Sequence, residues 1–189
     1  MPEPATLTWL LQRLTRLLAA SITTLEQQPF PVGAVAEAWE QEVARQLARY
    51  HAAAMLTGAN TQQLTPAMRT KVEADLRSQL AYLKRFRLEI QDAAAFQEGW
   101  KARAAMYAGS IRVPYWHGAT KMLPLPAMPA EGTQCLTHCK CSWEIDTLEG
   151  DGNYDAYWRR GADDSCQTCV QRAASWAPVR IREGVLQLG

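Results

Sequence analysis

The sequence predicts an α+β protein in which a mainly α-helical N-terminal region is followed by a small cysteine-rich module built on a β-hairpin. Apolar residues recur at helical spacing through the first half of the chain, and a proline-rich stretch then interrupts them. All five cysteines lie beyond that stretch, in two clusters separated by a predicted hairpin. We therefore divide the chain into a helical domain at 1–118, a proline-rich connector at 119–134 and a cysteine-rich module at 135–189.

The first predicted helix covers residues 5–27. Arg13 and Arg16 fall on its polar face, and Pro29 marks the end of the helix. We expect the apolar face to pack against a protein core rather than a membrane surface. That face carries side chains spaced three or four residues apart, namely Leu7, Leu10, Leu11, Leu14, Leu17, Leu18, Ile22 and Leu25.

Three further helices are expected, at 32–57, 66–91 and 93–107. Gly58 is suited to cap the C-terminus of the second helix, because glycine readily adopts the left-handed conformation found there. Thr65 precedes a proline and is a plausible N-cap for the third helix. The mixed basic and acidic residues of this third helix indicate a solvated face rather than a nucleic-acid groove.

The remainder of the chain predicts short elements. The connector contains "KMLPLPAMPAEGTQ", with three prolines in six residues, and cannot sustain a helix. The segments "CSWEIDTLEG" and "YDAYWRRG" are typical of two short strands joined by a turn. A short helix, "CVQRAASW", is expected after them, and the tail "VRIREGVLQL" could add a final strand or strand pair.

Composition and the N-terminal residues exclude several classes of protein. With 48% hydrophobic and 21% charged residues, the chain is typical of a globular protein rather than a disordered one. A net charge of +1 argues against a protein that mainly coats nucleic acid. No basic segment precedes the first apolar residues, and no apolar run reaches the roughly 18 residues that cross a bilayer. We expect a soluble intracellular protein whose cysteines remain thiols or bind metal.

The cysteine spacing predicts a metal site. Zinc prefers four soft ligands in a tetrahedron, and small domains often supply two from a turn and two from the first turn of a helix. A helix N-terminus also lowers a thiol pKa, which favours the anionic form that binds metal. The order of turn, hairpin and helix resembles a treble-clef or zinc-ribbon layout. The candidate ligands of one structural zinc ion are Cys135, Cys139, Cys141, Cys166 and Cys169.

Five cysteines are one more than a tetrahedral site needs. The Cys166–Cys169 pair is the surer half, and the first cluster is expected to add Cys135 with either Cys139 or Cys141. His138 could replace one of these ligands, although a solvated turn histidine is the plainer interpretation. We expect the zinc to act as a structural staple that lets a small tryptophan-rich core fold. That core is expected to contain Trp143, Trp158 and Trp176.

Other uses of the cysteines have less support. A redox Cys-x-x-Cys pair calls for a preceding βαβ pattern, which the sequence lacks, and a disulfide framework leaves one cysteine unpaired. Glu144 follows the first cluster closely but is expected to be a surface residue, and no acid–base constellation accompanies it. We therefore expect no enzymatic activity. His51 and His117 show no ligand spacing and are expected to be core or surface histidines.

The segment "KARAAMYAGSIRVPYWHG", the proline-containing connector, "CLTHCKCSW", a hairpin and "CQTC" follow one another along the chain. This succession, over about residues 97–185, resembles tailed-bacteriophage head morphogenesis or minor capsid proteins related to the Mu F-like family. The resemblance implies a structural virion protein that acts in head assembly and is made in the cytoplasm of the host bacterium. It also implies that the partners are other head proteins, either the portal or the major capsid protein, or further copies of the chain.

A second hypothesis is a zinc-dependent regulatory protein that binds nucleic acid. The C-terminal module is locally basic, and its arginines could contact phosphates. The short helix "CVQRAASW", however, offers few polar side chains to read base edges, so nucleic acid is the less favoured partner. The arginines in question are Arg159, Arg160, Arg172, Arg180 and Arg182.

Overall fold

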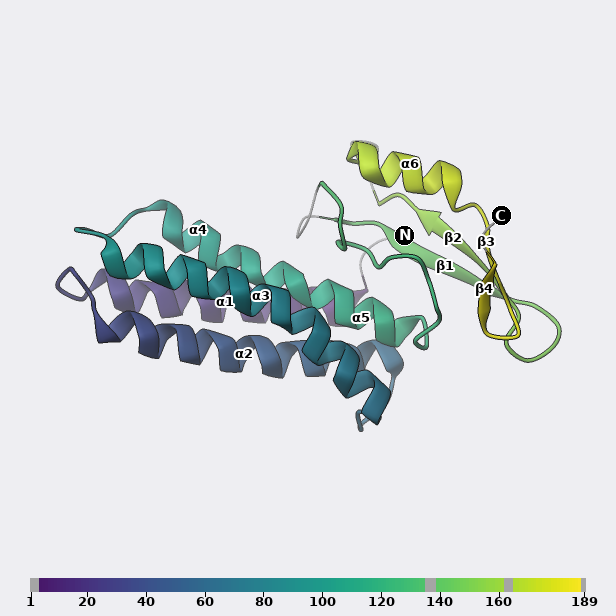
Figure 1. Ribbon diagram of the computed structural model, residues 1–189, viewed down its shortest axis with the longest axis horizontal. Coiled ribbons are helices and arrows are strands. Elements are labelled where there is room, and N and C mark those ends of the chain that lie inside the picture. Colours follow the sequence, from purple (N-terminus) through teal and green to yellow (C-terminus); the bar gives the residue numbers. More distant parts are fainter. Residues whose placement is uncertain (1–3, 135–138, 162–164, 188–189) are drawn as a thin grey trace.

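Long helices lie side by side through the first two thirds of the chain, and a small sheet with one helix sits at one end of them (Figure 1). This computed structural model describes residues 4–134, 139–161 and 165–187. The helical elements of the bundle are α1 (Ala5–Glu26), α2 (Ala34–Ala59), α3 (Pro66–Asp92), α4 (Gly99–Met106), the 3₁₀ helix η1 (Tyr107–Ile111) and α5 (Arg112–Ala119).

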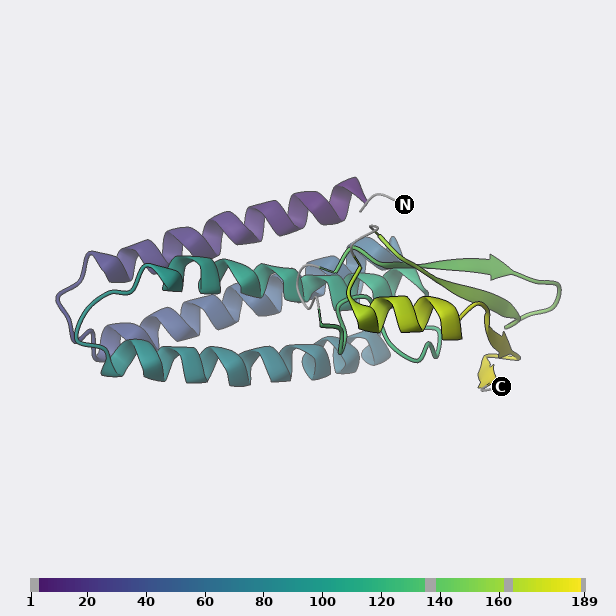
Figure 2. The ribbon, with the colours of Figure 1, turned by 90° about the horizontal axis from the view of Figure 1, so that it is seen from above.

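The elements α4, η1 and α5 run end to end, so the bundle has four rods (Figures 1 and 2). The prediction of a helix at 93–107 was therefore wrong at both ends. The 3₁₀ turn accommodates Gly109 without ending the rod, and Pro114 lies in the first turn of α5. A proline is tolerated there because the first N–H groups of a helix have no intrahelical partner.

The bundle core confirms the helical spacing of the first helix, with one exception. Leu7, Leu14 and Ile22 are fully or almost fully buried, whereas Leu17 is 41% exposed. Aromatic rings from three rods complete this core around Phe86, which contacts Trp39 edge-on and stacks on Tyr107, the ring centroids lying 5.5 and 6.4 Å apart. The predicted cap of α3 is confirmed by a hydrogen bond of 3.2 Å from the Met68 N–H to the Thr65 hydroxyl.

Helices α2 and α5 cross at two glycines. A Cβ atom added to Gly58 would lie 2.0 Å from the Tyr115 carbonyl oxygen, and one added to Gly118 would lie 2.3 Å from the Met55 carbonyl oxygen. Gly58 is therefore a packing residue inside α2 and not its predicted C-cap. Asn60 takes that position in the left-handed conformation, with a φ of 51°.

His51 is buried against η1. Its Nε2 lies 2.8 Å from the Ser110 hydroxyl oxygen, and that hydroxyl donates to the Tyr107 carbonyl, so the ring carries its proton on Nε2. Burial lowers the pKa of His51 to about 4. His117, also buried, lies 3.7 Å from the Asp75 carboxylate, and burial lowers its pKa to about 3. Both histidines are core residues.

The C-terminal module is a four-stranded antiparallel sheet with one helix. Its strands lie in the order β1-β2-β3-β4, and β1 pairs with β2 so that Trp143 faces Trp158. Helix α6 packs against the sheet through Cys169 and Ala173 (Figures 1 and 2). The bounds are β1 (Ser142–Thr147), β2 (Tyr154–Arg159), α6 (Gln167–Ser175), β3 (Val179–Arg182) and β4 (Val185–Gln187).

Two features join the module to the bundle. Helix α5 includes the first residue of the predicted connector, Ala119, and residues 120–134 contain no helix or strand. The Ala127 carbonyl accepts a hydrogen bond of 2.8 Å from the Trp143 indole. Trp116 of α5 packs against both hydrophobic cores, and Val113 packs against that of the module. No helix in the described ranges is long and apolar enough to cross a membrane.

We expect Gly58→Ala to destabilise the bundle by about 1–3 kcal/mol, because the new methyl group meets backbone atoms that cannot rotate away. The matched control is Gly99→Ala in α4, where the methyl group meets nothing within 4 Å. The control should leave stability unchanged or raise it by about 0.4–1 kcal/mol. Urea unfolding followed by far-UV circular dichroism measures both. Equal midpoints for the two variants would contradict the close helix crossing.

We expect stability to fall as the pH drops from about 6.5 towards 5. Because His51 has a folded pKa below the ordinary value of about 6.5, the unfolded state binds more protons throughout this range. Replacing it by His51→Gln should flatten the decline by about 1–2 kcal/mol between pH 7 and pH 5. The part of the pH-dependent loss of stability that His117 contributes should remain. The measurement is the free energy of unfolding across this range, and identical slopes in both proteins would rule out a buried neutral His51.

Candidate metal centre

Three buried thiols meet where the hairpin and α6 come together. Cys139 and Cys141 lie in the segment that enters β1, and Cys169 lies in the first turn of α6. Their Sγ atoms all lie within 4.8 Å of one another, and those of Cys139 and Cys169 are 3.9 Å apart. Cys166 is the N-cap residue of α6 and packs against the same hydrophobic core. We call these four residues the thiol cluster.

The sulfur spacing suits a metal rather than a disulfide. A disulfide needs about 2.05 Å between its sulfurs, and the Cys139 and Cys169 sulfurs lie well beyond that distance. Zinc bonded to sulfur at about 2.3 Å in a tetrahedron places the sulfurs about 3.8 Å apart. The distance of 3.9 Å between the Cys139 and Cys169 sulfurs is close to this value. The described cysteines therefore form a cluster that could bind a metal ion.

Backbone N–H groups support negative charge on the sulfurs. The Cys141 thiol has a lowered pKa, chiefly because it accepts a hydrogen bond from Cys139 and also because the Gly161 N–H points to it. The pKa of Cys139 is raised, first because its proton is shared with Cys141 and then because it is buried. The N–H groups of Ala130 and Cys141 act in the opposite direction on Cys139. A bound metal cation would displace the proton that the sulfurs of Cys139 and Cys141 share.

Gly161 allows the end of β2 to close over the first cysteine pair. A Cβ atom at this position would lie 2.0 Å from the Lys140 carbonyl oxygen, so no side chain fits between the two segments. Lys140 is the residue between Cys139 and Cys141. The absence of a side chain therefore brings the Gly161 N–H to the Cys141 sulfur.

Three tryptophans pack into the core around the thiol cluster, as predicted. Trp143 meets Trp158 edge-on and stacks on Trp176, with ring centroids 5.2 and 5.7 Å away. The Arg172 guanidinium lies over the Trp158 and Trp176 rings at 5.2 and 5.0 Å and donates to the Glu131 carbonyl at 2.8 Å. Helix α6 thus contributes the Cys169 sulfur to the thiol cluster. It also contributes Arg172, whose guanidinium joins the aromatic core to the connector.

The structure brings together most of the candidate ligands. Cys139 and Cys141, which the sequence offered as alternatives, both lie at Cys169, and Cys166 starts the same helix. Cys135 and His138 lie outside the described residues. Gly161 was not among the predicted site residues, although its position directly after the basic end of a predicted strand indicated a backbone turn. The backbone N–H donors could not be predicted, because no side-chain pattern reveals them.

Comparison with known proteins adds no assignment: no protein-family model matches the chain, and no curated protein or solved structure matches it significantly.

We expect Trp143→Phe to destabilise the module about 1–3 kcal/mol more than Trp158→Phe does. The first change strands the buried Ala127 carbonyl that accepts from Trp143, and an unpaired buried acceptor carries that penalty. The second removes an indole N–H that has no hydrogen-bond partner among the described residues. Urea unfolding followed by near-UV circular dichroism reports on the remaining tryptophans. An equal loss in both variants would show that the Ala127 bond contributes nothing.

Proposed function

We propose that Cys139, Cys141, Cys166 and Cys169 bind one structural zinc ion. The observation that carries this proposal is the meeting of three buried thiols within 4.8 Å, with a fourth cysteine at the N-cap of the same helix. The four sulfurs would complete a tetrahedron and leave no position for substrate or water. Cys135 is then the surplus cysteine of the sequence.

The surroundings of the thiol cluster support a structural role. Glu144, the acidic residue next to the first cysteine pair, is half-exposed and forms an ion pair with Arg159. It is therefore already engaged at the surface, and a general base beside a metal-bound water would have to be free. The buried tryptophans around the sulfurs favour a staple that holds a small core. We propose that the protein is not an enzyme.

We expect the purified protein to carry one zinc ion per chain. Serine substitution at any member of the thiol cluster should abolish stoichiometric binding, whereas Cys135→Ser should retain it. Chelation should remove the part of the near-UV signal that Trp143, Trp158 and Trp176 contribute and leave the helical far-UV signal, because the metal stabilises only the module. Native mass spectrometry under reducing conditions measures the stoichiometry. A metal-free protein that also fails to take up added zinc would refute the site.

We further propose that the chain is a structural component of a bacteriophage head, acting beside the portal or major capsid protein. The resemblance of residues 97–185 to head morphogenesis proteins supports this proposal. The architecture is compatible with it, because a rigid helical bundle with a small stapled module offers two distinct docking surfaces. Self-association of the chain belongs to the same proposal. The virion is the corresponding location.

We expect the chain to sediment with head particles released by the bacterium that carries its gene. Gradient fractions analysed by mass spectrometry should contain it in heads, and deletion of the gene should reduce the yield of complete heads while tails still form. Complementation with Cys169→Ser separates the two proposals, since a head protein that needs no zinc would still restore assembly. A normal particle yield without the gene would contradict the assignment.

Nucleic-acid binding receives less support from the geometry. Three of the five module arginines are engaged within the protein. Arg159 pairs with Glu144, Arg172 lies over two tryptophans, and Arg182 pairs with Asp155 at 2.7 Å. Phosphate contacts would have to compete with these partners. A salt-dependent mobility shift with mixed-sequence DNA at low ionic strength would revive this alternative.

A further inference from the structure

A groove runs along the bundle between α1 and the rod formed by α4, η1 and α5. Two hollows of about 560 and 490 Å³ adjoin there and share Leu11, Thr15 and Arg112 as lining residues. Figure 2 shows α1 diverging from the other rods towards its N-terminus. We call the two hollows together the α1–α4 groove; it lies on the bundle and uses no residue of the thiol cluster.

The hollow beside α4 is lined mainly by small and apolar side chains. Ala102 and Ala105 line it together with Met106, which is 45% exposed, and Arg112 lines it as well. Small side chains let a second helix approach closely, and an exposed methionine adapts its shape to an apolar partner. This end of the groove is therefore suited to an apolar helix face.

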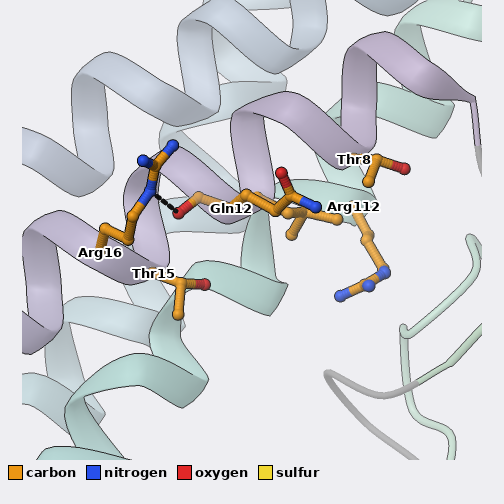
Figure 3. A pocket seen from close by; sticks show the side chains of 6 residues that line it. Thr8, Gln12, Thr15, Arg16 and Arg112 are labelled. Carbon is orange, nitrogen blue, oxygen red and sulfur yellow. Dashed lines mark hydrogen bonds between the residues drawn. The ribbon is translucent and has the colours of Figure 1, made fainter.

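The other end is positively charged. Arg16 and Arg112 line it together with the polar side chains of Thr8 and Gln12 (Figure 3). The Arg16 guanidinium donates only to the Gln12 carbonyl of its own helix, at 3.3 Å, and forms no ion pair within the described part of the chain. A carboxylate that reached this end would meet an arginine with unused donors.

The walls contain no negative charge that would repel such a carboxylate. Neither residues 5–25 nor residues 99–119 include an aspartate or glutamate. The cations nearer the far end are already neutralised, because Lys101 pairs with Glu26 at 2.8 Å and Arg103 pairs with Glu89. Arg16 is therefore the groove cation on which the proposal is based, since it forms no ion pair with a described residue.

We propose that the α1–α4 groove binds an acidic amphipathic helix of a partner protein. The apolar face of that helix lies over Ala105 and Met106, and its carboxylates lie beside Arg16. A helix fits better than a strand, because the groove walls are helices whose backbone groups offer no edge for pairing. The lining of α1 from Thr8 to Arg16 extends for about 12 Å, enough for roughly two turns of the partner.

The geometry favours a protein over nucleic acid. Duplex binding depends on many cations arrayed along the phosphate backbone, whereas the hollow beside α4 is lined mainly by small and apolar side chains. The proposal goes beyond the zinc site and does not depend on it. An acidic amphipathic helix of another head protein would be such a partner.

The test uses the full chain as purified and two synthetic peptides of 16 residues. Both peptides carry leucine and alanine on one helical face; the rest of the first is glutamate and the rest of the second is lysine. Fluorescence anisotropy at 0.15 M salt should show that the glutamate peptide binds at least about tenfold more tightly than the lysine peptide. Hydrogen exchange of the complex should show protection within residues 8–16 and 102–112.

Three variants make the test specific. Arg16→Glu and Ala105→Glu should each weaken binding of the glutamate peptide at least about tenfold, because each places a carboxylate in the α1–α4 groove. Arg69→Glu makes the same change of charge on the exposed start of α3 and should leave binding unchanged. Far-UV circular dichroism confirms that each variant is folded.

Several outcomes would overturn the proposal. These are no binding of the glutamate peptide, equal binding of the lysine peptide, equal loss in Arg69→Glu, or protection outside the two segments. A dimer in analytical ultracentrifugation that Ala105→Glu dissociates would assign the groove to a second copy of the chain. Tighter binding of a DNA duplex than of the glutamate peptide, lost in Arg16→Glu, would assign it to nucleic acid.

Discussion

The C-terminal module depends on the contact between the sulfurs of Cys139 and Cys169, which joins segments 30 residues apart in the chain. A unit of about 50 residues buries too little apolar surface to fold securely by itself. Of the eight buried residues that form its described core, three are cysteines of the thiol cluster. A core in which three of eight buried side chains are cysteines gains little folding stability from burial alone. It gains much when a cation converts buried thiols into cross-links, because metal binding energy then becomes folding energy.

The position of the module on the bundle follows from helix α5. Its Val113 and Trp116 enter the core of the module, while Gly118 locks the same helix against α2 without an intervening side chain. The connector adds a second tie, from Ala127 to Trp143. A chain of close contacts therefore runs from the middle of the bundle to the tryptophans around the thiol cluster.

Features that depend on neighbouring residues could be predicted from the sequence, whereas features that depend on contacts between distant residues could not. Periodic leucines predicted α1, a threonine before proline predicted the start of α3, and the hairpin and its tryptophans followed from short alternating segments. Gly58 was misread because a glycine near a helix end has the same local signature whether it caps the helix or admits another helix. Local spacing could not predict that Cys139 and Cys141 both lie beside Cys169, since this depends on where the chain brings Gly161 and α6.

Helix α5 also connects the two surfaces to which we assign partners. It begins at Arg112, which lines the α1–α4 groove, and one turn later places Trp116 against the module. The two surfaces differ in chemistry, because one offers sulfur to a metal ion and the other offers a cation and small apolar side chains to a helix. They nevertheless share one short, tightly packed element of eight residues. A helix seated in the groove would therefore be held at a fixed distance and angle from the module that carries the thiol cluster. Such rigidity would suit the head-assembly role proposed above, in which the chain positions two partners.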